Sequence, residues 1–205
     1  MQNEQARSNI YALLSRVLLQ ELDDDMLDTV KNDEAILEFL PNFAKWDLLD
    51  TLENGDLLQR HLNPDFINLS VLHLIPYESF YRRDDQMVET GGANPVTDIY
   101  SAYNFLVDYE AARVISSDHI GVELEFMHRL VEAQMQAAAE NDDAAVAQLL
   151  ATQKEFLNKH LLQWAILYLL NVKYEAMTPL YHDIADMCIE FLLGDNEYLH
   201  NICEA

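Results

Sequence analysis

The sequence predicts an all-α fold. Only 5 Gly and 5 Pro occur among 205 residues, so few positions favour turns or interrupt helices. Apolar residues return at three- and four-residue spacing along most of the chain, whereas the alternation typical of strands is nearly absent. Half of the residues are hydrophobic, which is enough to form a proper core. We therefore predict a single compact helical domain that spans residues 1–205.

The first part of the chain is expected to form four helices. The first carries an apolar stripe made of Ile10, Leu13, Leu14, Val17 and Leu18 and ends near residues 23–25. The others are expected at 33–40, 46–62 and 66–81. Pro41 and Pro64 should end the second and third helices, and Pro76 should kink or interrupt the fourth, because proline lacks a backbone donor and clashes with the preceding turn.

The longest irregular stretch follows at residues 82–94 and contains Gly91-Gly92, so we expect a flexible connection there. Asn94 before Pro95 is typical of a helix start. The remaining helices are expected at 95–112, 118–140 and 143–171, with a last one from Thr178-Pro179 onward. Gly194 should end this last helix in a left-handed turn.

The charge of the chain restricts the class of partner. Lys and Arg number 12 and Asp and Glu number 36, which gives a formal net charge of −24. Such a chain repels a phosphate backbone, so we predict no nucleic-acid binding and favour a cationic partner. Most of the carboxylates are expected to coat solvated helix faces.

Several common signatures do not occur in the sequence. Cys188 and Cys203 form no CxxC pair and are predicted to be reduced thiols. No basic flank leads into an apolar stretch near the start, and no run of 18 apolar residues occurs, so we expect a cytoplasmic protein without stable membrane insertion. No phosphate-binding loop, GxSxG or HExxH pattern occurs. The common nucleotide, hydrolase and metalloprotease signatures are therefore missing, and we predict no cofactor.

One metal-binding pattern is an alternative. Glu125 and His128, and again Glu197 and His200, have the Glu-x-x-His spacing that helical di-iron proteins use to place two ligands on one face. Two such pairs arise readily by chance in a chain with 7 His and many Glu. A helical di-metal carboxylate protein nevertheless stays an alternative.

The segment Pro76-Tyr77-Glu78-Ser79-Phe80-Tyr81 is a candidate binding site. A proline interruption frees backbone carbonyl groups, and these groups and the Tyr77 ring could line a cleft that receives an extended peptide. The alternative is a core helix that bends at Pro76.

A second candidate lies at the start of the predicted 118–140 helix. Asp118 and His119 place a carboxylate and a titratable imidazole at one exposed corner, and Glu123, one turn later, could orient the imidazole or hold it charged. A helix cap from Ser116 or Asp118 and a structural hydrogen bond from His119 are the alternatives.

Three ordered motifs resemble one known family, the TorD/DmsD-type cytoplasmic chaperones that mature molybdenum oxidoreductases. They are Pro76-Tyr77-Glu78-Ser79-Phe80-Tyr81, then Asp118-His119-Ile120-Gly121-Val122-Glu123-Leu124-Glu125-Phe126-Met127, and finally Phe156-Leu157-Asn158-Lys159-His160-Leu161-Leu162-Gln163-Trp164. The resemblance covers residues 76–170, and the first 70 residues agree only in helical character. Ser117 stands where many relatives have Pro, and Tyr77 stands where Trp is common.

The resemblance implies a non-enzymatic chaperone of the all-α TorD-like type. Such a protein binds the twin-arginine signal peptide and the unfinished apoprotein of a molybdopterin-containing oxidoreductase, and it delays export until the cofactor is inserted. Carried over by motif, Pro76, Tyr77, Asp118 and His119 would line the peptide cleft, with Ser79 and Glu123 in support.

The residue chemistry agrees with such a partner. An arginine pair needs carboxylates that accept forked hydrogen bonds, which Asp118 with Glu123 or Glu78 can supply, and an aromatic surface such as Tyr77. A generic helical adaptor is a further alternative, and a homodimer formed by helix exchange at the 82–94 connection is a further expectation.

Overall fold

The computed structural model describes residues 2–91 and 93–204, and Gly92 of the predicted flexible connection lies outside the described residues. Within those ranges the chain forms helices and connecting segments without a strand, which confirms the all-α prediction. One isolated antiparallel bridge pairs Tyr77 with His119. None of the described helices combines the length and apolar character that crossing a bilayer requires.

The chain divides into two compact units, and each is discontinuous in sequence. The first joins the chain up to Leu19, Pro76–Ile166 and the chain from Phe191 onward, while the second joins Gln20–Ile75 and Leu167–Glu190. Two long helices, α12 (Leu162–Glu175) and α13 (Pro179–Glu204), contribute residues to both units.

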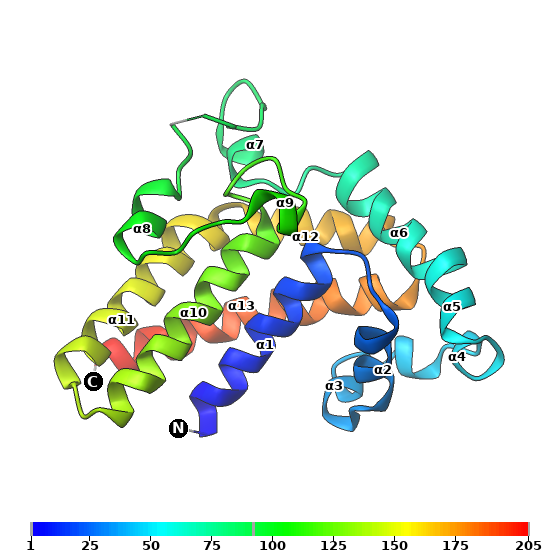
Figure 1. The fold of residues 1–205 in the computed structure, drawn as a ribbon, viewed down its shortest axis with the longest axis horizontal. Helices are drawn as coiled ribbons and strands as arrows, with labels where there is room; N and C mark the ends of the chain where they lie inside the picture. The colour runs from blue at the N-terminus through cyan, green and yellow to red at the C-terminus, as the bar shows by residue number, and fades with distance from the viewer. Residues whose placement is uncertain (1, 92, 205) are drawn as a thin grey trace. The chain divides into compact units, whose positions relative to one another are not determined.

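The remaining helices belong to one unit each (Figure 1). The first unit contains α1 (Gln2–Leu19), α7 (Glu78–Arg82), α8 (Thr97–Ala102), α9 (Tyr109–Ala112), α10 (Ile120–Ala139), α11 (Asp143–Phe156) and the π-helical turn η4 (Leu157–Leu161). The second contains α2 (Asp24–Asn32), α3 (Glu34–Glu38), η1 (Phe43–Lys45), α4 (Leu48–Thr51), α5 (Asn54–Leu57), η2 (Leu58–Leu62), α6 (Asn63–Ile67) and η3 (Asn68–Leu72).

In the first unit, α1 lies against α10 (Figure 1). Ser15 Oγ donates a hydrogen bond of 2.7 Å to the carbonyl of Gly121. A Cβ atom on Gly121 would lie 2.7 Å from Cβ of Leu19 and 3.0 Å from its Cα. Glycine is therefore required at this position, because it lets the two backbones approach closely.

We expect Gly121→Ala to lower the free energy of unfolding by about 2 kcal/mol, because the new methyl group overpacks the contact with Leu19. Gly194→Ala is the matched control, since a Cβ atom at this position of α13 meets nothing within 4 Å. The control should raise stability by about 0.5–1 kcal/mol through helix propensity. Urea unfolding of both variants measures the difference, and equal effects would contradict a close contact at Gly121.

A buried ion pair also stabilises the first unit. The guanidinium of Arg7 contacts the carboxylate of Asp195 through two bonds of 2.5 and 3.0 Å. Tyr11 Oη donates to the same carboxylate at 2.7 Å, and Arg7 Nη2 donates to Gln153 Oε1 at 2.8 Å. Helices α1, α11 and α13 are thereby joined through polar side chains inside the unit.

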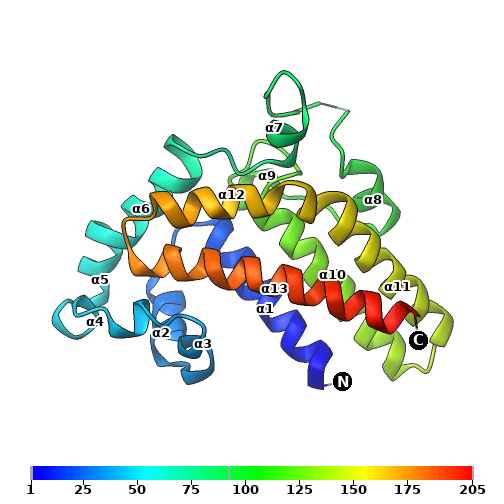
Figure 2. The same cartoon turned by 180° about the vertical axis from the view of Figure 1, so that it is seen from behind.

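In the second unit, buried carboxylates accept backbone N–H groups from distant parts of the chain. Asp183 Oδ2 accepts from Asn42 N and Phe43 N at 2.8 and 2.9 Å. Asp65 Oδ2 accepts from Thr178 N at 2.8 Å, directly before α13. Figure 2 shows that α12 and α13 run in opposite directions; within this unit Lys173 pairs with Asp186 at 2.5 Å.

The helix boundaries of the second unit differ from the expected ones. Helix α2 was not predicted, and the expected 46–62 helix is divided between α4 and the stretch that begins with α5. Pro64 does not end that stretch, which stays helical to Leu72. The reason is the wide π-helical turn directly before it: Asn63 N bonds to Leu58 O, and a turn with an extra residue accommodates the proline ring.

The expected 66–81 helix is interrupted, as its proline predicted. Helical structure ends at Leu72, Pro76 lies in an extended connection, and α7 begins at Glu78.

In the second half, the 118–140 and 143–171 helices are confirmed, the latter as α11, η4 and α12 in succession. The 95–112 helix is instead two short helices, α8 and α9. The prediction for Gly194 was wrong, since α13 continues to Glu204 and no described glycine has a positive φ. Its neighbour Asp195 is held inside the unit by Arg7, so the helix is fixed beyond the glycine.

Candidate functional site

The first two motifs lie side by side in the first unit. Glu78 N donates to Asp118 O and Ile120 N donates to Pro76 O, both at 2.9 Å. The carbonyl of Pro76, one of the groups that could have been free for a peptide, is therefore paired with the second motif. The chain leaves the helix before Pro76 and forms a bridge there.

Asp118 is fully buried at the centre of a polar network. Its Oδ2 accepts a hydrogen bond of 2.7 Å from Ser79 N, which caps the first turn of α7 rather than that of α10. Its Oδ1 lies 2.9 Å from Asn94 Nδ2 and 2.5 Å from Ser116 Oγ. Asp118 is thus a helix cap, which was the alternative to a binding role. It caps α7, which is distant in sequence, and not α10.

His119 caps α10 with its side chain. The Nδ1 atom accepts from Gly121 N at 3.1 Å, and only 4% of the residue is exposed. Burial lowers the pKa of His119 to about 3, so the ring is neutral at physiological pH. The expectation of an exposed, titratable corner at Asp118 and His119 was wrong, because both side chains are buried.

Tyr77 contacts the ring of His119 edge-on, with 5.0 Å between the ring centroids. Its hydroxyl oxygen accepts a hydrogen bond of 3.2 Å from Ile115 N. Tyr77 is itself largely buried. The ring of Tyr77 therefore packs against the second motif and does not form an exposed aromatic surface.

Glu78 and Glu123 are both fully buried. Glu78 Oε2 lies 2.9 Å from His160 Nδ1, and Glu78 Oε1 contacts Arg82. Glu123 Oε2 accepts from Trp164 Nε1 at 3.3 Å. Burial, followed by the nearby charges of Glu78 and Asp118, raises the pKa of Glu123 well above its usual range.

The expectation that Glu123 holds His119 charged was wrong, because burial lowers the pKa of that imidazole. Glu123 bonds to Trp164 of the third motif. The third motif also packs through its rings. Phe156 and His160 stack at 4.8 Å, and Trp164 lies 5.4 Å from Tyr81. The structure thus brings all three motifs together.

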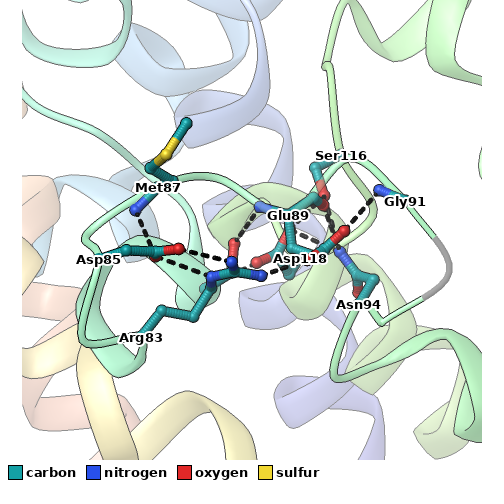
Figure 3. A network of polar contacts seen from close by, with 9 residues as sticks. Arg83, Asp85, Met87, Glu89, Gly91, Asn94, Ser116 and Asp118 are labelled. Atoms are coloured by element: carbon teal, nitrogen blue, oxygen red, sulfur yellow. Dashed lines mark hydrogen bonds and ion pairs between the residues drawn. The ribbon is translucent and has the colours of Figure 1, made fainter.

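A network in the 83–94 segment was not predicted (Figure 3). Arg83 bonds to both oxygens of Asp85 at 2.9 and 2.7 Å and also contacts Glu89. Glu89 N donates to Ser79 Oγ at 2.9 Å, and Glu89 O accepts from Ser116 Oγ at 2.6 Å. The described part of this segment is tied to both motifs. The adjacent charges at residues 82–85 were the only sequence signal for it.

Acidic and apolar side chains are exposed beside this network. Asp84 and Asp85 are exposed, and Met87 is 63% exposed. Ile115, next to Ser116, is 64% exposed. Tyr109 is half-exposed, and its hydroxyl group lies 2.6 Å from Ser117 Oγ.

Three of the four residues in the two Glu-x-x-His pairs make other contacts. His200 Nδ1 lies 2.8 Å from Asn196 O. Glu125 lies 3.5 Å from Arg129, and His128 Nδ1 lies 2.9 Å from Ser8 Oγ. Across residues 2–91 and 93–204, no group of three or more potential metal ligands occurs. These pairs therefore do not assemble the ligand set that the di-metal alternative requires.

Comparison with known proteins finds one matching family and several similar proteins. Residues 31–167 match the model of a family described as nitrate reductase delta subunit. The chaperone protein TorD of Aliivibrio salmonicida is 26% identical over 215 residues, which cover 94% of this chain and 97% of that protein.

Two further relatives carry the same name. The chaperone protein TorD of Photobacterium profundum is 27% identical over 215 residues, with 94% of this chain and 96% of that protein covered. That of Aliivibrio fischeri is 26% identical over 177 residues, with 79% of each chain covered. No solved structure matches this chain.

Proposed function

Because this chain belongs to the nitrate reductase delta subunit family, we propose that it is a dedicated cytoplasmic chaperone for a molybdopterin-containing oxidoreductase. It binds the twin-arginine signal peptide and the apoprotein of this client, assists cofactor insertion and delays export until maturation is complete. The relatives named chaperone protein TorD support a chaperone rather than an enzyme.

The observation that carries this proposal is the assembly of the three motifs around buried carboxylates. Asp118 holds the start of α7 through Ser79 N and holds Asn94 at the end of the 83–94 segment. The exposed acids and Met87 belong to this segment, which Glu89 ties to Ser116, next to the exposed Ile115. Acidic groups beside apolar groups are the chemistry that an arginine pair followed by an apolar stretch requires.

The predicted peptide-binding residues then have two kinds of role. The proposed set is Pro76, Tyr77, Glu78, Ser79, Asp118, His119 and Glu123. The buried Asp118, His119 and Glu123 act as positioning residues, because they shape the segments that carry the exposed groups. Glu78 is the member that already binds a guanidinium, that of Arg82.

The test is a titration with three synthetic signal peptides that differ only at the arginine pair. We expect the Arg-Arg peptide to bind about tenfold more tightly than an Ala-Ala peptide, with Lys-Lys between them, because a guanidinium bonds a carboxylate through two parallel hydrogen bonds. Fluorescence anisotropy at low and high salt measures the affinities, and binding should weaken as salt screens the acidic surface. Equal affinity for all three peptides would favour the generic adaptor.

A further inference from the structure

The chain carries an arginine pair of its own beside the candidate site. Arg82 and Arg83 follow each other at the end of α7 and are two of only 12 basic residues. Arg82 Nη1 contacts Glu78 and also donates to Lys159 O at 2.9 Å. Arg83 bonds to Asp85 and Glu89. Both guanidinium groups are therefore bound to carboxylates of the site.

The exposure of these groups shows which contact faces solvent. The side chain of Glu78 is 0% exposed, that of its partner His160 is 14% exposed and that of Arg82 is 42% exposed. Arg82 is thus the most solvent-accessible contact of this carboxylate. A guanidinium from another molecule can reach Glu78 only after Arg82 has moved.

We propose that Arg82 and Arg83 are an internal occupant of the site, and that the arginine pair of the client peptide displaces them. This inference rests on the proposed function and adds a mode of regulation to it. The exchange replaces two guanidinium groups by two others, so each carboxylate keeps a guanidinium partner, and Asp85 keeps a bidentate one.

The contacts of Arg83 are weak enough to exchange reversibly. The side chain of Arg83 is 39% exposed and that of its partner Asp85 is 46% exposed, and exposed ion pairs contribute little to stability. The contact of Arg82 with the buried Glu78 exchanges only when another guanidinium takes its place, because an unpaired buried carboxylate is costly. While the internal pair occupies the site, the client peptide cannot bind there. The apparent affinity for the peptide is therefore the intrinsic affinity multiplied by the fraction of time for which the site is open. The internal pair does not change the preference for an Arg-Arg over a Lys-Lys peptide, because both peptides bind the same carboxylates and compete with the same internal pair. When the client peptide is to be released, Arg82 and Arg83 can bind the carboxylates again and compete with the peptide.

The experiment compares Arg82→Gln/Arg83→Gln with the wild-type chain in the same peptide titration. Glutamine keeps a neutral donor near each carboxylate but cannot form the forked ion pair. We expect the double variant to bind the Arg-Arg peptide about tenfold more tightly, as follows if the internal pair closes the site for about nine-tenths of the time. The ratio of affinities for the Arg-Arg and Lys-Lys peptides should stay unchanged.

Arg60→Gln/Arg129→Gln is the matched control. Arg60 pairs with Asp56 and Arg129 with Glu125, both as exposed helix pairs outside the site. Each double variant removes two positive charges, which takes the formal net charge from −24 to −26. The control therefore reproduces the change in long-range attraction, and we expect its affinity to change less than about twofold.

Arg83→Gln alone decides the matter if the double variant does not fold, because this change breaks only partly exposed contacts. We expect it to raise the affinity about threefold. The inference is overturned if wild type prefers Arg-Arg while the folded variants bind no more tightly than the control. The proposed function fails in a different way, when the wild-type chain does not distinguish the three peptides.

Discussion

Asp195→Ala is expected to lower the free energy of unfolding by about 4 kcal/mol, because it leaves the buried guanidinium of Arg7 without its carboxylate. The side chains of this pair are 5% and 1% exposed. Tyr11 loses the same acceptor. For a chain of this size, a loss of this magnitude corresponds to a fall of roughly 10 °C in the unfolding midpoint. Urea unfolding followed by circular dichroism measures the change.

Asp186→Ala is the control for this change. It removes the same kind of side chain from an ion pair with Lys173, but the two side chains are 41% and 37% exposed. We expect a loss of no more than about 1 kcal/mol. If Asp195→Ala were equally mild, the buried network of α1, α11 and α13 would not hold the first unit together.

Asp118→Ala should cost about 3 kcal/mol of stability and abolish preferential binding of the Arg-Arg peptide. The change leaves the buried N–H of Ser79 without its acceptor and removes one of the acceptors of Asn94 Nδ2, which also donates to Ser116 Oγ and Glu89 O. An unsatisfied buried donor costs about 1–3 kcal/mol. Asp118→Asn should cost about half as much, because an amide oxygen can still accept from Ser79. Denaturant unfolding and the peptide titration together report both effects.

Asp142→Ala provides the comparison. Asp142 also caps a helix, accepting from Ala145 N at 3.0 Å, but it is exposed. Its loss should cost about 1 kcal/mol and leave peptide binding unchanged. A wild-type preference for the Arg-Arg peptide in Asp118→Ala would contradict the positioning role of Asp118.

The long helices could be predicted because their apolar periodicity extends over many turns. The 118–140 and 143–171 helices lie close to their expected positions. The short elements could not, since a helix such as α9, with only four residues, contains too little periodicity to distinguish it from a turn. Pro64 and Gly194 misled the prediction because local rules cannot foresee a wide turn before a proline or a carboxylate held by a distant arginine.

The members of the candidate site could be selected from the sequence, but their environment could not. The three motifs meet, yet Asp118 and His119 are buried rather than exposed. Sequence shows that a carboxylate and an imidazole are adjacent, but burial depends on segments that arrive from elsewhere, such as Ser79 and Asn94. The contacts of Arg82 and Arg83 were missed for the same reason, because they depend on how the chain turns after α7.

The contact between Arg7 and Asp195 joins residues 188 positions apart, and this separation affects how the protein matures on the ribosome. While synthesis proceeds from the N-terminus, Arg7 of α1 is made early but lacks the carboxylate of Asp195 until α13 has been made. Closing so long a loop also costs chain entropy that only the finished core repays. The first unit therefore completes its fold late in translation, and nascent chains that stop before Asp195 should be sensitive to protease.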